Sequence, residues 1–319
     1  MTSSLPSCPF VAGQKITDPQ LFVGRKQELE LITSQMTALQ PVSINVVGPR
    51  RIGKSSLLYH FFQTYEQRVP EPKRYVAIYL SLQEAQCQSE DGFYQAVARR
   101  LWHHLTVQRN PALIEPLKVN PFNRLAFCAA MGQYKRQGVL PVLCLDEFGP
   151  LFRHPEEFGD GFFDNLRSLM ESGVLMLVVA SHRRLDFYQR RHKLRSAFFK
   201  TWQVVTLGEL TEAAAEELVT FPTSRIPGTT AALTMQEQRW VRQWGGRHPY
   251  LLQLAAGLVY EARQLGQEMS WAKAEFEKEA RLVSKPKGDF SSRLGCLAKI
   301  IGGLILLSLI VLVVMSLLN

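Results

Sequence analysis

Short apolar runs alternate with longer amphipathic segments through the first two thirds of the chain. Runs of about four to eight apolar residues have the length of strands buried on both faces, and the segments between them are long enough to form helices. Strands that alternate with helices are typical of a parallel sheet covered by helices. The predicted strands span Ser43–Val47, Tyr75–Leu82, Val142–Leu145, Leu175–Ala180 and Val204–Leu207. The pattern predicts an α/β core over residues 21–208 with a parallel sheet of about five strands and flanking helices, preceded by a leader over residues 1–20.

The pattern changes beyond Leu207, where strand-like runs give way to helical periodicity. Breaks in this periodicity fall at residues 221–228, which include two prolines, and at Gly245-Gly246. We therefore predict a small helical lid over residues 209–283.

A long apolar run, Ile300–Leu318, contains no charged residue. About 19 residues at about 1.5 Å per residue span about 28 Å, close to the hydrocarbon thickness of a bilayer. The alternatives, a core helix or an amphipathic surface helix, normally show a polar stripe that this run lacks. A basic linker over residues 284–299 precedes the run, and basic residues flank membrane spans on the cytoplasmic side. We predict a single-pass transmembrane helix over residues 300–318 that tethers a cytoplasmic N-terminal domain to a lipid bilayer.

A glycine-containing loop follows the first predicted strand and opens a helical pattern over Lys54–Gln63. It matches G-x-x-x-x-G-K-[ST], whose backbone N–H groups surround nucleotide phosphates at a helix N-terminus. In this motif the lysine contacts the β- and γ-phosphates and the hydroxyl ligates Mg²⁺, so we assign these roles to Lys54 and Ser55. The predicted nucleotide-binding residues of the loop are Gly48, Pro49, Arg50, Arg51, Ile52, Gly53, Lys54, Ser55 and Ser56.

A second motif, Pro141–Glu147, places two carboxylates after an apolar strand. Ligands of open α/β sheets bind at the carboxyl ends of the strands, so these carboxylates are expected beside the phosphate loop. Asp146 is the expected partner of Mg²⁺, and Glu147 is placed to deprotonate the attacking water. The pair favours hydrolysis over two alternatives, a nucleotide kinase and an adaptor that binds nucleotide without hydrolysing it.

A third strand should end at Ser181, beside the second motif. Two interpretations of Ser181 stay open: a catalytic hydrogen bond to the γ-phosphate or the lytic water, or a plain strand end. The next segment, residues 182–200, carries seven Arg and Lys residues against one acid. This charge fits nucleic acid, an acidic partner, lipid or a solvated loop, and the slight aromatic interleaving disfavours nucleic acid.

Composition adds two restrictions. The formal net charge is +9, and the excess gathers in residues 182–200 and before the apolar run. The five cysteines show no metal-ligand spacing. Their odd number and the lack of a signal peptide are typical of a reducing cytosol.

The ordered motifs resemble those of STAND/AAA-like P-loop ATPases, which belong to the additional-strand class. The family's F-x-G-R box, which lies against the adenine, is similar to Phe22, Val23, Gly24 and Arg25. Gly246–Leu252 looks like the signature of the family's lid, whose proline packs on the base and is here Pro249. The resemblance covers roughly residues 9–265 and implies ATP as the nucleotide, with an extra strand between the two motif strands.

Motifs and resemblance together predict a membrane-tethered ATPase that acts as a switch, in which ATP closes the lid and hydrolysis reopens it. The alternative is a ring-forming, membrane-anchored AAA-type motor that remodels protein or nucleic acid. Expected partners are the bilayer, an unknown protein and, on ATP binding, a second copy of the chain. Nucleic acid is a less favoured partner.

Overall fold

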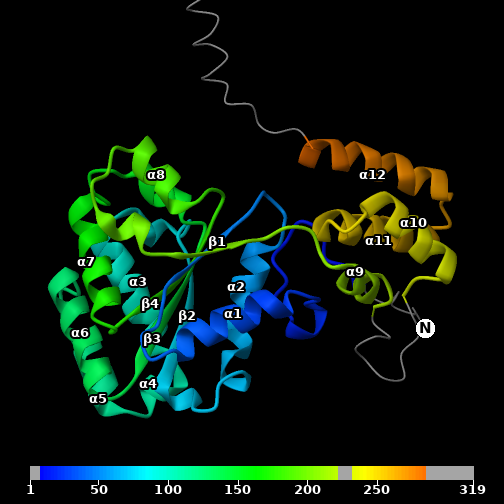
Figure 1. Cartoon of the computed structure of the whole chain (residues 1–319). Coiled ribbons are helices and arrows are strands. Elements are labelled where there is room, and N and C mark those ends of the chain that lie inside the picture. Colours follow the sequence, from blue (N-terminus) through cyan, green and yellow to red (C-terminus); the bar gives the residue numbers. More distant parts are fainter. Residues whose placement is uncertain (1–7, 222–231, 285–319) are drawn as a thin grey trace, which may run out of the picture. The chain divides into compact units, whose positions relative to one another are not determined.

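The structure, a computed structural model, describes residues 8–221 and 232–284 (Figure 1). Its strands are β1 (Ile44–Val47), β2 (Tyr75–Ser81), β3 (Leu140–Asp146), β4 (Met176–Ser181) and β5 (Gln203–Thr206). They form one sheet in the order β2-β3-β4-β1-β5, and every neighbouring pair is parallel. The prediction of a parallel five-stranded sheet is confirmed.

The strand ends lie close to the predicted ones. The largest difference is at β3, which begins at Leu140 and runs through Pro141. Pro141 pairs with Val76 of β2. Proline is tolerated there because it lies near the start of the strand, where few ladder hydrogen bonds precede it.

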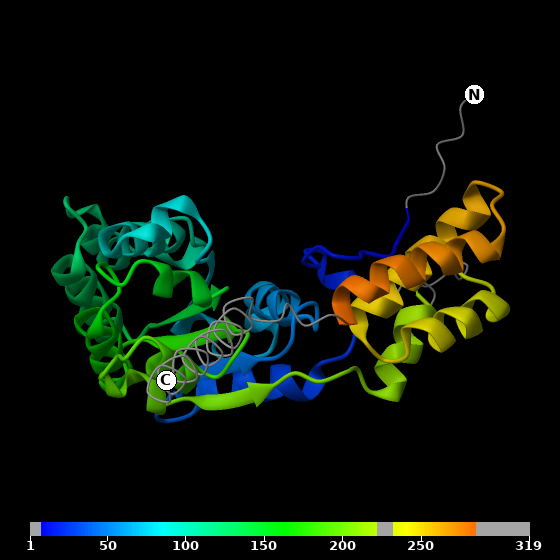
Figure 2. The ribbon, with the colours of Figure 1, turned by 90° about the horizontal axis from the view of Figure 1, so that it is seen from above.

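The side chains of the central strands alternate between two hydrophobic cores, which is why their sequences are continuously apolar. In β3, Leu143 and Leu145 join one core, and Val142 and Cys144 join the other. The first core is covered by α3 (Glu90–Trp102), α6 (Arg124–Arg136) and α7 (Asp160–Glu171), and the second by α1 (Lys26–Thr37) and α2 (Lys54–Thr64). Figures 1 and 2 show these two sets of helices on opposite sides of the sheet.

The remaining helices connect or follow the strands. Two single turns, α4 (Leu105–Gln108) and α5 (Pro111–Ile114), join α3 to α6, and α8 (Leu185–Arg191) follows β4. After β5 come α9 (Glu212–Val219), α10 (Met235–Gly245), α11 (Pro249–Gln264) and α12 (Met269–Ser284). Helices α9, α10 and α11 pack against one another. The chain beyond β5 is thus helical as far as it is described, while the exact domain boundaries stay predictions.

The described residues up to Lys273 form one compact unit, and a second unit begins at Ala274, of which the structure describes only residues 274–284. Among the described residues, no helix is long and apolar enough to cross a membrane. The predicted transmembrane helix over residues 300–318 lies outside the described residues, so the anchor stays a prediction.

The strand register brings the predicted motifs to one edge of the sheet. Val47 at the end of β1 pairs with Ser181, and Ser81 pairs with Asp146. Because β4 lies between β1 and β3, the intervening strand implied by the resemblance is present. The phosphate loop, Glu147 and the segment after Ser181 therefore leave the sheet side by side, at the edge where open α/β sheets bind ligands.

Candidate nucleotide site

The phosphate loop joins β1 to α2 and is tightly packed. Gly53 is the N-cap of α2 and has a φ of 97°, a left-handed conformation that favours glycine. A Cβ atom at Gly48 would lie 2.9 Å from Ile52 Cγ2 and 3.0 Å from the carbonyl oxygen of Leu207. Both glycines of the motif are therefore required by the shape of the loop itself.

Lys54 opens α2 and is only 7% exposed. Its Nζ donates to the carbonyl oxygens of Gly48 and Pro49, both at 2.8 Å, and lies 3.4 Å from Nδ1 of His182. Burial lowers the pKa of Lys54, and the nearby carboxylate of Glu147 acts against this shift. The ammonium group is thus held inside the loop that the motif assigns to phosphates.

Ser55 and Asp146 meet beside the loop. The Ser55 hydroxyl donates to Asp146 Oδ1 at 3.1 Å, and the backbone N–H of Glu147 donates to the same oxygen at 3.0 Å. The other carboxylate oxygen accepts a hydrogen bond of 2.6 Å from the Tyr79 hydroxyl. Burial, with Asp146 beside it, raises the pKa of Tyr79 far above its usual value, so this hydroxyl keeps its proton and acts as the donor.

The donor set at this point suits Mg²⁺. Magnesium prefers oxygen ligands and usually combines one or two protein groups with phosphate oxygens and waters. The Ser55 hydroxyl and the Asp146 carboxylate supply two such oxygens. Within residues 8–221 and 232–284, no cluster of three or more His, Cys, Asp or Glu could hold a metal ion by itself. The residues therefore fit an ion shared with nucleotide phosphates.

Glu147 follows Asp146 with a φ of 54°, which is uncommon for a residue with a side chain and marks local strain. Its side chain lines the cavity described below, and its Oε2 lies 3.7 Å from Nε2 of His182. Burial, and next the charge of Asp146, raises the pKa of Glu147. A carboxylate with a raised pKa is a stronger base, as the activation of water requires.

His182 lies between Lys54 and Glu147. An ammonium group has only donors, so the His182 Nδ1 beside it accepts and the ring proton belongs on Nε2, facing Glu147. Burial, and next the positive charges of Lys54 and Arg50, lowers the pKa of His182, which favours the neutral ring. No sequence motif includes this residue, and its place directly after a predicted strand end is the only signal for it in the sequence.

Ser181 ends β4 but does not line the cavity. Its hydroxyl accepts from Asn45 Nδ2 at 2.8 Å and donates to the carbonyl oxygen of Arg183 at 2.6 Å. The single hydroxyl proton is therefore used within the turn. Of the two interpretations of Ser181, this geometry favours the strand end, and His182 occupies the place beside Lys54.

A cavity of about 310 Å³ is lined by several of these groups and by apolar side chains. Its polar lining includes Lys54, Ser55, Glu147 and His182, and its apolar lining includes Phe22, Val23, Leu210, Pro249 and Tyr250. The Phe22 ring is itself anchored, since it stacks on His60 with 4.1 Å between ring centroids. The volume falls at the lower end of the range of about 300–1,000 Å³ for small-molecule pockets.

Arg25 belongs to the cavity wall, but its guanidinium is bound within the protein. Its Nη2 donates to the carbonyl oxygen of Gly208 at 2.6 Å and to that of Ile52 at 3.2 Å. Gly24 precedes it with a φ of 73°. Arg25 thus ties the phosphate loop to the segment after β5, a structural role that the sequence motif did not reveal.

Other loop residues reach towards α11 and the leader. Arg50 and Arg51 line the cavity, and the Arg51 guanidinium lies over the Tyr250 ring, 4.2 Å from its centroid. The Ser56 hydroxyl accepts a hydrogen bond of 3.1 Å from the backbone N–H of Ile16. Neither the leader nor Tyr250 was predicted as part of the site.

The parallel sheet with β4 between the motif strands, the phosphate loop and the Asp146–Glu147 pair define a P-loop NTPase of the additional-strand class. A family model described as novel STAND NTPase 1 matches residues 14–278, and the chain belongs to this family. The resemblance to STAND/AAA-like P-loop ATPases is confirmed.

Solved structures share the fold at low sequence identity. The Walker-type ATPase of Pyrococcus abyssi matches with a TM-score of 0.57 and 14% identity, over 90% of this chain and 79% of that one. The ORC2 protein of Aeropyrum pernix, solved as ADPNP-ADP complexes, matches with a TM-score of 0.56 and 13% identity, over 81% and 69%. Domain III of the Thermotoga maritima replication initiation protein DnaA matches with a TM-score of 0.51 and 16% identity, over 85% and 98%. No functionally curated protein matches the chain.

Proposed function

We propose that the protein binds ATP together with Mg²⁺ and hydrolyses it. The bound nucleotide then determines how the helices after β5 pack against the phosphate loop. The observation that carries this proposal is a cavity lined by Lys54, Ser55 and Glu147 together with apolar side chains, where Ser55 is hydrogen-bonded to Asp146. The phosphate loop with its lysine suits phosphates, and the apolar side chains suit a purine base.

The chemistry follows from the positions of the side chains. Lys54 and the N-terminus of α2 would bind the β- and γ-phosphates. Ser55 and Asp146 would hold Mg²⁺, which when bound offsets negative charge on the phosphate oxygens. Glu147 accepts a proton from the water that attacks the γ-phosphorus, and the bond to the bridging oxygen breaks to leave ADP and phosphate.

The switch is supported by contacts between the phosphate loop and the segment beyond β5. Arg51 lies over Tyr250 of α11, and Arg25 bonds to carbonyl oxygens on both Ile52 and Gly208. A rearrangement of the loop around phosphates would alter these contacts directly. A ligand that changes the free energy of such contacts shifts the populations of two conformations.

Lys54→Ala tests the binding step. Loss of a buried charged hydrogen bond costs about 1.5–3 kcal/mol, so we expect the affinity for ATP to fall about 10- to 100-fold in isothermal titration at constant Mg²⁺. Lys73→Ala, which removes an exposed lysine outside the cavity lining, is the matched control. Equal affinities of Lys54→Ala and the parent protein would refute the phosphate-loop assignment.

A second function, nucleic-acid binding, is favoured by exposed basic side chains before, on and after α8, which we call the basic surface. It consists of seven exposed side chains: Arg183, Arg184, Arg190, Arg191, Lys193, Arg195 and Lys200. Asp186 is paired with Arg184 and with Arg190, each at 3.4 Å. In the described part of the chain no carboxylate is ion-paired with the other five, so the surface keeps most of its positive charge.

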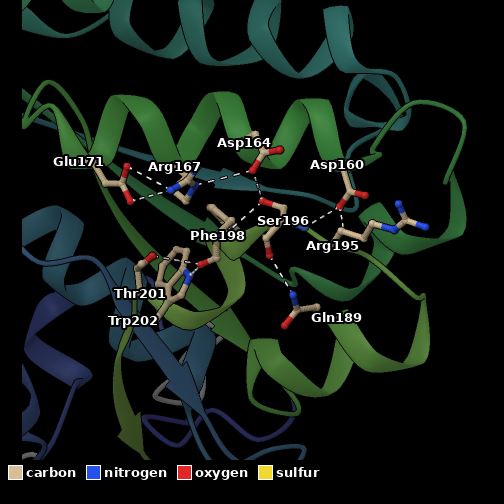
Figure 3. Close-up of polar contacts among 10 residues, drawn as sticks. All are labelled: Asp160, Asp164, Arg167, Glu171, Gln189, Arg195, Ser196, Phe198, Thr201 and Trp202. Atoms are coloured by element: carbon tan, nitrogen blue, oxygen red, sulfur yellow. Dashed lines mark hydrogen bonds and ion pairs between the residues drawn. The ribbon is translucent and has the colours of Figure 1, made fainter.

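Two acids of α7, Asp160 and Asp164, are hydrogen-bonded to the segment that carries Arg195 (Figure 3). Asp160 Oδ1 accepts from the backbone N–H groups of Arg195 and Ser196 at 2.7 and 2.8 Å, and Asp164 accepts from the Ser196 hydroxyl at 2.7 Å. The Arg195 side chain extends away from this network (Figure 3). Arginine side chains held on an ordered backbone suit phosphate groups, which they bind in a bidentate manner.

Charge reversal on the basic surface tests this second function. Each phosphate contact contributes about −0.9 to the slope of log affinity against log salt. For a labelled DNA duplex in fluorescence anisotropy, Arg191→Glu with Lys193→Glu should weaken binding at least about tenfold and reduce this slope by about two. The control pair, Lys73→Glu with Arg109→Glu, makes the same charge change at exposed positions outside the basic surface. Equal weakening by both pairs, or no binding by the parent protein, would contradict the proposal.

A further inference from the structure

The leader segment, residues 11–16, is fastened to two distant elements. The backbone N–H of Val11 donates to the side-chain oxygen of Gln253 on α11 at 2.9 Å. The backbone N–H of Ile16 donates to the hydroxyl of Ser56 on α2 at 3.1 Å. The leader segment therefore links α11 to the helix that begins at the phosphate loop.

Lys15, between these two fastenings, lies between two tyrosine rings. Its Nζ is 4.1 Å from the ring centroid of Tyr59 on α2 and 4.0 Å from that of Tyr79 on β2. The two rings meet edge to face, with centroids 5.0 Å apart. A cation at this distance from two aromatic rings is attracted by both, so Lys15 holds the leader segment against Tyr79.

Tyr79 continues this chain of contacts to the expected metal ligands. Its hydroxyl donates to Asp146 Oδ2 at 2.6 Å, while Oδ1 of the same carboxylate accepts from Ser55 at 3.1 Å. Asp146 is only 5% exposed. A hydrogen bond at each carboxylate oxygen fixes the rotation of this carboxylate. Ser55 is followed by Ser56, whose hydroxyl accepts the hydrogen bond from Ile16 of the leader segment. The contacts from the leader segment through Lys15, Tyr79, Asp146 and Ser55 thus lead back to the leader segment.

We propose that Lys15 and Tyr79 are positioning residues through which the leader segment and the Mg²⁺-nucleotide site reinforce each other. This inference rests on the proposed nucleotide site. Tyr79 holds Asp146 in the orientation that faces Ser55, and Lys15 holds the Tyr79 ring and the leader segment together. Removal of a group that hydrogen-bonds a metal ligand and orients it typically lowers metal affinity by about 10- to 100-fold.

The coupling has to be reciprocal. If a seated leader segment strengthens the binding of the Mg²⁺-nucleotide, then the bound Mg²⁺-nucleotide must stabilise the seated leader segment by the same factor. The backbone N–H groups of Val11 and Ile16 are hydrogen-bonded donors, so their hydrogen exchange reports how often the leader segment opens. Metal affinity and leader exchange are therefore two independent readouts of one coupling.

The test uses the full chain with ADPNP as the nucleotide. Tyr79→Phe removes only the hydroxyl and keeps the ring beside Lys15, and Lys15→Met removes the charge but keeps an unbranched side chain. Tyr94→Phe is the matched control, because Tyr94 is a buried tyrosine whose hydroxyl donates to Glu90 at 2.9 Å, away from the cavity. ADPNP affinity is measured in EDTA and across a Mg²⁺ titration, and exchange is followed in peptides covering residues 8–16.

In Tyr79→Phe we expect the affinity for ADPNP in EDTA to equal that of the parent protein. The Mg²⁺ concentration that gives half of the Mg²⁺-dependent increase in ADPNP affinity should be about tenfold higher. Lys15→Met should shift the Mg²⁺ requirement by about threefold in the same direction. Mg²⁺-ADPNP should slow exchange of the leader segment in the parent protein and in Tyr94→Phe, and this slowing should be lost in both test variants.

Two results would overturn the inference while leaving the nucleotide site intact. One is a Mg²⁺ requirement of Tyr79→Phe and Lys15→Met equal to that of Tyr94→Phe. The other is leader exchange in the parent protein that does not respond to Mg²⁺-ADPNP although ADPNP binds. A parent protein that binds no ADPNP would refute the proposed function itself, and this inference with it.

Discussion

Glu147 is the residue whose proposed role depends most on its neighbours. Its carboxylate shares the cavity with Lys54 and lies 3.7 Å from the ring of His182. Burial raises the pKa of Glu147, while Lys54 acts in the opposite direction, so the carboxylate remains a base beside a cation. Its left-handed backbone conformation brings the side chain to the cavity directly after Asp146.

The first residue-scale prediction concerns Glu147→Gln. The amide keeps the shape of the side chain but cannot accept the proton of the attacking water. We expect ATP binding to be retained and hydrolysis to fall about 10²-fold or more, measured as phosphate release under single-turnover conditions. Glu171→Gln, at an exposed position on α7, is the control. Hydrolysis by Glu147→Gln at the parent rate would show that another residue is the base.

The second concerns the pH dependence of stability at His182. Burial and the charges of Lys54 and Arg50 lower the pKa of His182 in the folded protein below its usual value of 6.5. Below pH 6.5 His182 therefore binds a proton more readily in the unfolded chain than in the folded protein. The free energy of unfolding decreases as the pH falls through this range. The free energy of unfolding should drop less on acidification in His182→Gln than in the parent protein, as measured by urea denaturation at several pH values. Identical pH profiles would contradict the neutral state of this ring.

At the scale of elements, the contact between α9 and the turn before α1 decides how closely the helices beyond β5 approach the core. Gly24 lies in this turn with a φ of 73°, and a Cβ there would be 2.8 Å from the Cβ of Ala214 on α9. The glycine of the F-x-G-R pattern is therefore required both by its left-handed backbone conformation and by its close packing against α9. Only the absence of a side chain lets the two elements meet at this distance.

Gly24→Ala tests this contact. We expect the left-handed conformation to cost about 1–2 kcal/mol and the crowding against α9 about 1–3 kcal/mol more in the free energy of unfolding, measured by urea denaturation. Gly173→Ala is the matched control, since Gly173 has a φ of 60° and nothing within 4 Å of its Cβ position. Equal destabilisation by the two changes would show that the close approach to α9 adds nothing to stability.

At the scale of the whole molecule, the sequence predicts an anchor over residues 300–318 that the described residues do not include. The compact unit that contains the nucleotide site ends at Lys273, before this run. A chain cut after Lys285 should therefore move from the membrane pellet to the soluble fraction and keep its affinity for ATP. Release of the full-length protein by carbonate washing would refute a spanning helix, and loss of ATP binding on truncation would place the apolar run in the folded core.

The sheet, the phosphate loop and the Asp146–Glu147 pair could be predicted from the sequence alone. These features are local: apolar runs report strands buried on both faces, and each motif lies within one strand and the turn that follows it. The helices described beyond Leu207 could also be predicted, because helical periodicity does not depend on distant partners.

Which further side chains reach the site depends on how the distant parts of the chain pack together. Tyr79 meets Asp146 across 67 residues of sequence, and His182 meets Lys54 across 128, so neither pairing leaves a local pattern. Ser181 and His182 show that even neighbouring residues are hard to assign to the site from the sequence. Successive side chains along a strand point to opposite faces, so locating the end of β4 could not tell whether Ser181 or His182 faces the cavity. The register of β4 against β1 and the hydrogen bond from Asn45 turn Ser181 inward and leave the cavity to His182.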